Sequence, residues 1–184
     1  IDITQERINT FADCTEDHQF IHVDEEAAKM IKKNGAYLST QTGVYLGEAP
    51  ADWNPDQVAK QQAAKNGLAN MFKLAKKHKL KLALGTDLIG AAKPEQSKEL
   101  SNRLEWFSPA EILIQATSNN AELLAMSGPR NPYPGKLGVI QEGAYADILL
   151  IDGNPLENLH LIDEPEKNIA VIMKDGVIYK DITK

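Results

Sequence analysis

The chain has 184 residues, of which 42% are hydrophobic and 25% are charged. This composition is typical of a globular protein and excludes the disordered and collagen-like classes. Lys and Arg total 20 and Asp and Glu total 26, a net charge of −6, so the chain lacks the basic character of a nucleic-acid binder. No apolar run is long enough to predict a membrane-spanning helix. A single cysteine, Cys14, excludes an internal disulfide and a multi-cysteine zinc site.

Helices and strands are predicted to alternate in the first half of the chain. Asp24 is typical of a helix N-cap, and Gly35 suits the end of that helix. Residues 36–40 are rich in strand-forming side chains. Asn54 followed by Pro55 predicts the start of a helix that runs to about His78, and residues 80–85 predict a second strand. Such alternation is typical of a parallel sheet or barrel.

Two helix starts are expected in the middle of the chain. The sequence Ser108-Pro109-Ala110-Glu111 is a capping box with proline at the first helical position. Asn119 followed by Glu122 repeats this pattern more weakly. We therefore expect two short helices, one ending near Thr117 and the other at Gly128.

Beyond Gly128, frequent proline and glycine residues predict short strands. Asp175-Gly176 between two apolar runs is a strong hairpin signal. Residues 136–184 are therefore predicted to be all-β, with a domain boundary near residues 129–136.

Asp87 is the strongest candidate for a functional residue, because it directly follows the apolar strand 80–85. In parallel α/β folds functional groups gather at the carboxyl ends of strands. A carboxylate at this position can bind a divalent metal or act as a base. The alternative is that Asp87 only caps a helix or turns the chain.

The four histidines and the cysteine carry weaker signals. His18 and His22 are spaced as helical metal ligands are, but their neighbours indicate an extended segment or a loop. We expect His78 to be solvated at a lysine-rich helix end and His160 to pack or hydrogen-bond locally. Cys14 is interpreted as a small buried residue rather than a nucleophile. Neither a nucleophile elbow nor a phosphate-binding loop motif occurs.

Three stretches together resemble the carboxyl-terminal part of the amidohydrolase superfamily of metal-dependent hydrolases, closest to its imidazolonepropionase-like and prolidase-like branch. The first, Leu82 to Asp87, resembles the final barrel strand of that superfamily. The second, Ser108 to Ala121, resembles its "SPxEAL…ATxNPA" helix pair. The third runs from Gly135 to Gly176 and resembles "GxIxxGxxADLVVLDGNPL…VxKDG". Several elements at fixed spacing make the third the most specific.

The resemblance implies an α/β fold: the last part of a (β/α)₈ TIM-type barrel in residues 1–130, followed in residues 131–184 by strands of a small β-sandwich domain. It implies one or two divalent metal ions, zinc in most relatives, in the complete enzyme. Asp87 matches the aspartate after the eighth strand, a metal ligand that also moves a proton. His18 matches the ligand after the sixth strand, with His22 in reserve, and the loops 41–53 and 88–103 would line the substrate pocket.

The chain also departs from the superfamily pattern. No His-x-His motif occurs, and a complete barrel needs about 250 residues. We therefore expect an incomplete C-terminal portion with an open sheet edge, which needs a missing N-terminal segment or a homo-oligomer to be stable.

The predicted function is metal-dependent hydrolysis of C–N bonds, amide or cyclic amide, in small molecules or dipeptides, by the complete protein; activity of the 184-residue chain alone stays open. The alternative is a truncated, non-catalytic module that binds a partner through its sheet edge and β tail. Neither nucleic acid nor membrane is an expected partner. The sequence begins with Ile and shows no signal peptide, so we expect a cytoplasmic protein that is either a mature form or a fragment.

Overall fold

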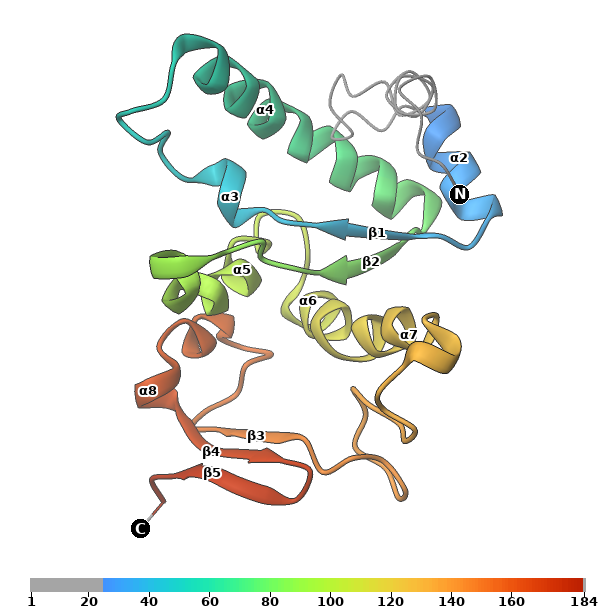
Figure 1. Cartoon of the computed structure of the whole chain (residues 1–184), viewed down its shortest axis with the longest axis vertical. Coiled ribbons are helices and arrows are strands. Elements are labelled where there is room, and N and C mark those ends of the chain that lie inside the picture. Colours follow the sequence, from blue (N-terminus) through green and yellow to red (C-terminus); the bar gives the residue numbers. More distant parts are fainter. Residues whose placement is uncertain (1–24, 184) are drawn as a thin grey trace.

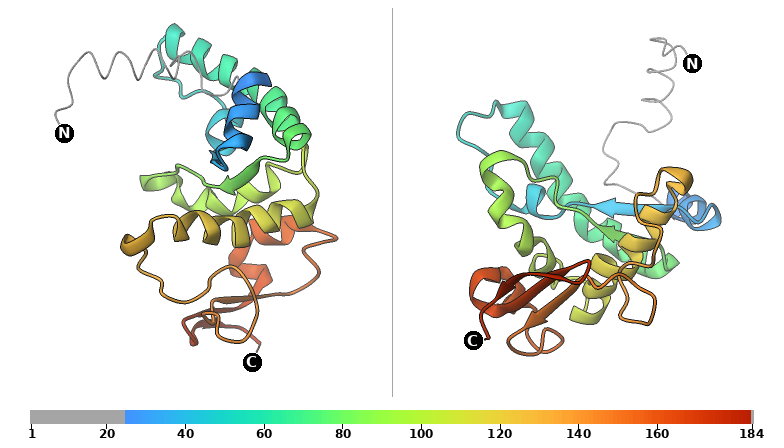
Figure 2. Two further views of the ribbon diagram at one scale, coloured as in Figure 1. Left: turned by 90° about the vertical axis from the view of Figure 1, so that its right-hand side faces the viewer. Right: turned by 60° about the horizontal axis from the view of Figure 1, so that its bottom comes forward.

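The structure is a computed structural model, and residues 25–183 are described. Three layers follow one another in Figure 1: helices α2 and α4, then the parallel strands β1 and β2, then the helical run α6–α7. A second sheet, β3–β4–β5, lies beyond this run, and the other two views show the same order (Figure 2). The proposed cap Asp24 lies outside the described residues.

The first half alternates helices and strands as predicted. Its elements are α2 (Glu25–Lys33), β1 (Tyr37–Thr40), the short helix α3 (Gly43–Leu46), α4 (Pro55–His78) and β2 (Lys81–Leu84). Helix α4 begins with a reciprocal capping box, in which Asn54 accepts from the Gln57 amide and Gln57 accepts from the Asn54 amide. Gly35 adopts the left-handed conformation expected after α2, with φ of 62°.

Strands β1 and β2 pair in parallel, from Tyr37 opposite Lys81 to Thr40 opposite Leu84. Leu38 and Leu82, which are opposite each other, are buried in the main hydrophobic core. Because the strands are parallel and in register, their carboxyl ends lie together. Residues 41–47 and 85–88 therefore leave the sheet at the same end.

A continuous helical run replaces the two separate helices expected in the middle of the chain. It consists of α6 (Pro109–Ile114), a π-helical turn (Gln115–Asn119) and α7 (Asn120–Ala125). The Ser108–Glu111 capping box is present as predicted. The second box is not, because the Asn119 side chain donates to the carbonyl of Leu82 instead of capping a helix.

The π turn is packed closely against Gly138 of the tail. The α-carbon of Gly138 lies so close to the turn that an added Cβ would be 2.5 Å from the Thr117 carbonyl oxygen. Only glycine fits there, and its φ of 69° also favours glycine. The segment 88–103, expected to be a loop, contains a 3₁₀ segment (Gly90–Ser97) and helix α5 (Lys98–Ser101).

The tail combines strands with short helices, so the prediction of an all-β region was wrong. Strands β3 (Ile148–Ile151), β4 (Ile169–Lys174) and β5 (Val177–Asp181) form an antiparallel sheet in that order. A 3₁₀ segment (Leu159–Asp163) and helix α8 (Pro165–Asn168) separate β3 from β4. The predicted hairpin is confirmed: Asp175 and Gly176 join β4 and β5 with φ of 49° and 76°, both positive as a type I′ turn requires.

An aromatic cluster anchors the core. The ring of Phe72 on α4 lies 4.9 Å from Trp106 and 5.0 Å from Phe107, measured between ring centroids. Leu159 and Ile162 of the tail belong to the same buried cluster. The tail is therefore packed onto the first part of the chain at this point, while strands β3 and β5 of the second sheet remain largely exposed.

Candidate functional site

Asp87 lies just beyond β2, in a short turn that the Thr86 side chain forms with the amide of Leu88. Its φ is 53°, in the left-handed region that Asp tolerates better than most side chains. The preceding Thr86 accepts a hydrogen bond through Oγ1 from the amide of Leu88, at 3.4 Å. Asp87 itself is exposed. The turn therefore presents its carboxylate to solvent at the carboxyl end of the parallel sheet.

The start of this turn is packed against the polypeptide that follows β1. A Cβ added to Gly85 would lie 3.4 Å from Ser39 Oγ and 3.5 Å from Gln41 Nε2. The side chains of Ser39 and Gln41 therefore lie beside the space that a Cβ of Gly85 would fill, and the two strand ends themselves are joined by the pairing of Thr40 with Leu84. The end of β1 is thus connected through its pairing to Leu84, three residues before Asp87.

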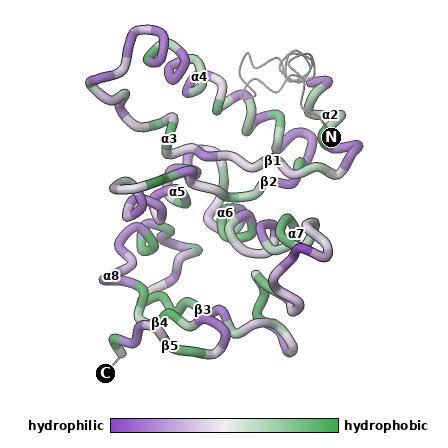
Figure 3. The backbone as a smooth tube through the Cα atoms, viewed as in Figure 1, coloured by the Kyte–Doolittle hydropathy of each residue, from purple (hydrophilic) through white to green (hydrophobic). Residues whose placement is uncertain are grey.

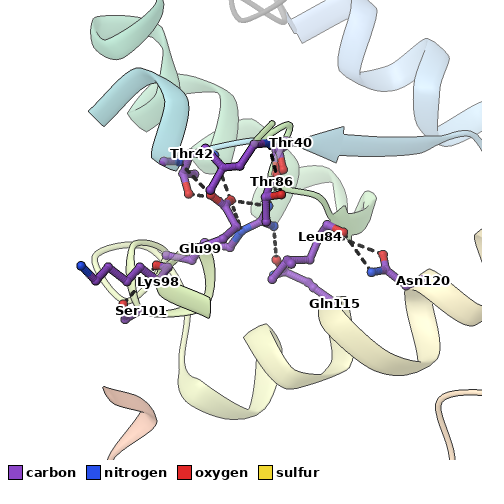
Figure 4. Close-up of polar contacts among 12 residues, drawn as sticks. Thr40, Thr42, Leu84, Thr86, Lys98, Glu99, Ser101, Gln115 and Asn120 are labelled. Atoms are coloured by element: carbon purple, nitrogen blue, oxygen red, sulfur yellow. Dashed lines mark hydrogen bonds and ion pairs between the residues drawn. The ribbon is translucent and has the colours of Figure 1, made fainter. Parts of the chain in front are cut away.

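Next to the strand ends lies a polar cluster that we call the buried clamp: Glu99, Arg103 and Gln115. Figure 4 shows Glu99 and Gln115 of this cluster below Thr40 and Thr42. The side chains of Arg103 and Glu99 are 0% and 1% exposed, and Arg103 Nη2 lies 2.9 Å from Glu99 Oε1. Arg103 also donates from Nη1 to Gln115 Oε1, at 2.7 Å, and from Nη2 to the carbonyl of Thr40. The guanidinium thus reaches the last residue of β1.

Glu99 holds the next two residues after that strand end. Its Oε1 accepts from the amide and the hydroxyl of Thr42, at 2.8 and 2.6 Å, and its Oε2 accepts from the amide of Gly43, at 2.7 Å. Burial lowers the pKa of the Arg103 guanidinium, while the Glu99 charge acts in the opposite direction. The clamp is therefore a charge-paired, hydrogen-bonded unit rather than an isolated buried ion.

The outer edge of β2 is covered by amide side chains. Asn120 donates to the carbonyl of Leu84 and accepts from its amide, both at 2.9 Å, as the backbone of a neighbouring strand would. Asn119 donates to the carbonyl of Leu82 at 2.8 Å. The expectation of an open sheet edge was therefore wrong at this edge of β2, because the end of the π turn and the start of α7 place both amides against it.

The described residues do not assemble a metal site by themselves. Among residues 25–183, no group of three or more His, Cys, Asp or Glu side chains is placed to bind an ion. Asp87 offers a single carboxylate, whereas stable sites in proteins use three or more ligands. His18 and His22, the predicted histidine ligands, and Cys14 lie outside the described residues. The metal-binding role of Asp87 and His18 stays a prediction.

A groove of about 390 Å³ lies elsewhere, between the end of α4, β2 and α6. Its lining includes Lys76, Lys79, Leu80 and Glu111. Leu80 precedes β2, whereas Asp87 follows it, so the groove lies near the amino end of that strand.

In the described part of the chain, no helix has the length and apolar character needed to cross a membrane.

Two other histidines have definite partners. His78 was expected to be solvated, but its side chain is 16% exposed and Nε2 lies 2.8 Å from Glu25 Oε1. The cause is tertiary, since α2 packs against the end of α4. The expectation that His160 hydrogen-bonds locally is confirmed, because its Nδ1 lies 2.9 Å from Asp163 Oδ2.

The sequence contains an indication of the clamp that was missed, because residues 88–103 were predicted to form a loop. Glu99 and Arg103 are four residues apart, the spacing of an ion pair on one helix face. Pairs of this kind are usually exposed, so spacing alone does not indicate burial. The burial of both side chains depends on the strand ends packed over them.

The family model that matches this chain is that of the amidohydrolase family, over residues 1–180. The chain belongs to the amidohydrolase family. This assignment confirms the resemblance found in the sequence, and it agrees with an α/β fold whose candidate carboxylate follows a parallel strand.

Proteins similar to this chain include a curated ochratoxinase and solved structures of a prolidase and of a Xaa-Pro dipeptidase. Ochratoxinase of Aspergillus niger is 27% identical over 172 residues, which are 92% of this chain and 34% of that protein. A crystal structure of a prolidase complexed with N-methylphosphonate-L-proline is 28% identical, with a TM-score of 0.73 over 86% of this chain and 38% of that one. A Xaa-Pro dipeptidase with bound methionine in its active site is 26% identical, with a TM-score of 0.70 over 85% and 37%. The chain thus spans about a third of the curated relative's length.

Proposed function

We propose that the protein, in its longest natural form, is a metal-dependent hydrolase of amide bonds in dipeptides or small molecules, with Asp87 as its catalytic carboxylate. One observation carries the proposal: this chain, a member of the amidohydrolase family, has an exposed carboxylate just beyond the carboxyl end of a parallel strand. Groups at this end of the strands perform the chemistry in parallel α/β enzymes. The prolidase and dipeptidase neighbours support an amide substrate of dipeptide size.

Asp87 has a chemical role that needs no contact with the core. In amide hydrolysis an oxygen of water attaches to the carbonyl carbon, the C–N bond breaks, and a proton moves from the water to the departing nitrogen. An exposed carboxylate can accept that proton and then deliver it. We also propose that Asp87 supplies one ligand to a divalent ion, zinc by analogy with the family, and that His18 supplies another.

The proposal includes an architecture. Strands β1 and β2 would be two neighbouring strands of a (β/α)₈ barrel within residues 1–130, and β3–β5 would belong to a small β-sandwich within residues 131–184. The parallel pairing of β1 with β2 and the antiparallel sheet that follows support this division.

The decisive experiment replaces Asp87 by Asn. Asn tolerates the left-handed conformation and keeps the size of the side chain, but it cannot accept a proton. We expect kcat to fall by a factor of about 100 or more, measured on dipeptides ending in proline, on other dipeptides and on ochratoxin. The melting temperature should be unchanged. Asp56→Asn, an exposed acid at the start of α4, is the matched control.

Metal dependence is tested separately on the unmodified protein. Prolonged dialysis against a chelator should remove activity, and zinc should restore it, with elemental analysis giving the ions bound per chain. Full activity in metal-stripped protein would contradict the metal-dependent part of the proposal. Loss of zinc in His18→Ala, but not in His22→Ala, would identify the second ligand.

The second candidate function is binding of a partner by a non-catalytic module. The exposed apolar side chains of β3 and β5 favour it, whereas the covered edge of β2 does not. Stable association with another chain, together with no hydrolysis of any substrate by metal-loaded protein, would decide in its favour.

A further inference from the structure

The buried clamp makes contacts that a core built only for stability does not need. The clamp hydrogen-bonds to three backbone groups outside it. They are the carbonyl of Thr40 and the amides of Thr42 and Gly43. All of these are at the carboxyl end of β1, on the side of the sheet from which Asp87 also emerges. Burying two charges is costly, and apolar side chains of the same volume often stabilise a fold as well or better. The location of these contacts therefore calls for an explanation besides stability.

We propose that Glu99 and Arg103 are positioning residues, which hold residues 40–43 so that the turn bearing Asp87 takes its working orientation. This inference rests on the proposed catalytic role of Asp87. It concerns a buried pair that does not touch the substrate and acts through the polypeptide packed above it.

The first step runs from the clamp to the strand end. Arg103 fixes the last carbonyl of β1, and Glu99 fixes the two amides that begin the next segment. Gly43 is fitted closely to the same side chains, because an added Cβ would be 3.3 Å from Glu99 Oε2 and 3.2 Å from Asn102 Nδ2. Little movement is available to this segment while the clamp is intact.

The second step runs from the strand end to Asp87. Thr40, whose carbonyl the clamp holds, is the strand partner of Leu84, three residues before Asp87. On the far side, Asn120 holds both backbone groups of Leu84. The polypeptide leading to Asp87 is thus held from two directions, and the clamp supplies one of them.

The test uses Thr42→Val in the full 184-residue chain. Thr42 is completely buried, and its hydroxyl donates to Glu99 at 2.6 Å. Valine has nearly the same shape, so the variant removes one clamp bond with little change in volume. Thr183→Val is the matched control, because the Thr183 hydroxyl donates to Asp181 Oδ1 at 2.5 Å on an exposed surface far along the chain from the clamp. Glu99→Gln is the second variant. It removes the charge of the clamp carboxylate and should therefore loosen residues 40–43 more than Thr42→Val does.

Two readouts in this chain do not depend on activity. Amide hydrogen exchange at Thr42 and Gly43 should accelerate by about tenfold in Thr42→Val while that of Leu82 does not change. The amide NMR signals of Thr86, Asp87 and Leu88 should shift in both clamp variants and not in the control. Unchanged NMR signals at residues 86–88, together with faster exchange at residues 42–43, would overturn the inference. An equal acceleration of exchange at the amides of Thr42, Gly43 and Leu82 would also overturn it.

Kinetics in the longest natural form of the protein give the third readout. We expect Thr42→Val to lower kcat by about tenfold with little change in KM, since a displaced acid–base group affects the reaction more than binding. A rise in KM alone would overturn the positioning role. If unmodified protein hydrolyses no substrate, the proposed function fails, while the NMR readout still decides whether the clamp positions the turn. If Glu99→Gln fails to fold, Thr42→Val alone provides the answer.

Discussion

The parallel pair β1–β2 and the antiparallel sheet β3–β5 differ in how much of their apolar surface is covered. Strand β3 reads Ile-Leu-Leu-Ile, which is more apolar than Lys-Leu-Ala-Leu in β2. Yet Leu82 and Ala83 in β2 are 5% and 1% exposed, whereas Ile148, Leu149 and Leu150 in β3 are 37%, 52% and 52% exposed. Figure 3 shows hydrophobic residues along all three strands of the second sheet. The apolar content of a strand therefore does not by itself determine its burial.

The difference lies in what each sheet has beside it. The helices α2 and α4 pack on one side of the parallel pair and α6–α7 on the other (Figure 1), and the amides of Asn119 and Asn120 cover its edge. Both faces of β3 remain accessible, because neighbouring residues of a strand point to opposite faces and Leu149 and Leu150 are equally exposed. Exposed apolar patches are typical of interaction surfaces, of ligand-binding grooves and of sites where proteins aggregate. We expect substitutions in the two sheets to differ accordingly in cost.

One of the two largest effects is expected at the clamp. Replacing Arg103 by Met would leave the Glu99 carboxylate buried without its charge partner, at a cost of about 3–5 kcal/mol in the free energy of unfolding. Urea denaturation measures this cost. Glu26→Gln breaks an exposed ion pair with Lys29 and should change stability by less than about 0.5 kcal/mol. A loss below about 1 kcal/mol in Arg103→Met would show that desolvation offsets the contacts of the pair.

A matched pair of apolar substitutions tests the comparison directly. Phe72→Ala removes a ring that is fully buried between Trp106 and Phe107, and it should cost about 3–5 kcal/mol. Leu150→Ala in the second sheet removes a half-exposed side chain and should cost less than about 1.5 kcal/mol. Both values come from chemical denaturation. Equal costs would mean that β3 is covered in solution, for example by self-association, which analytical ultracentrifugation would detect.

The covered edge of β2 should show an intermediate effect. Asn120→Ala removes the donor and the acceptor that pair with Leu84, and we expect a loss of about 1–3 kcal/mol. Hydrogen exchange at the Leu84 amide should also accelerate. Asn66→Ala is the control, since its side chain accepts from Gln62 on the exposed face of α4. If Asn120→Ala does not change hydrogen exchange at the Leu84 amide, water hydrogen-bonds to the backbone of Leu84 as well as the Asn120 side chain does.

The smallest effect concerns pH and the start of α6. Hydrogen bonds from Ser108, first from its backbone amide, and the charge of Lys76 lower the pKa of Glu111 below its usual 4.5. A carboxyl group with a lowered pKa in the folded state stabilises the fold above its unfolded pKa, and this contribution is lost as the pH falls through the folded pKa. Glu111→Gln should therefore be less stable than the unmodified chain at pH 7, with a smaller loss of stability between pH 5 and 3. Thermal unfolding at several pH values checks this, and identical profiles would contradict it.

Local sequence rules predicted the elements that depend on their own residues. The helix from Pro55 to His78 begins with an Asn cap and a proline and has the expected bounds. The Asp175-Gly176 turn has the backbone conformation that its two residues favour. In both cases the side chains that determine the conformation lie within a few residues of it, so tertiary structure had little to change.

Where prediction was wrong, the cause was a contact distant in sequence. His78 is shielded by Glu25, 53 residues away. The helix break expected near Thr117 became a π turn, and the side-chain amides of Asn119 at its end and Asn120 just after it pair with β2 more than 35 residues earlier. The segment 88–103 contains two buried charges because β1 packs over it. Asp87 was predicted from its position after a strand, and its exposure and conformation are consistent with that interpretation, while its chemical role stays a prediction.

By itself the sequence determined the α/β alternation, the helix caps, the hairpin and the family, because each of these depends on neighbouring residues or on motifs at fixed spacing. Only the tertiary structure decided that Glu99 and Arg103 are buried beneath the strand ends, that amide side chains cover the edge of β2, and that the most apolar strand is exposed. The physical reason is that burial and hydrogen-bond pairing depend on which distant segments meet. Spacing along the chain predicts which face a side chain occupies, but not what covers that face.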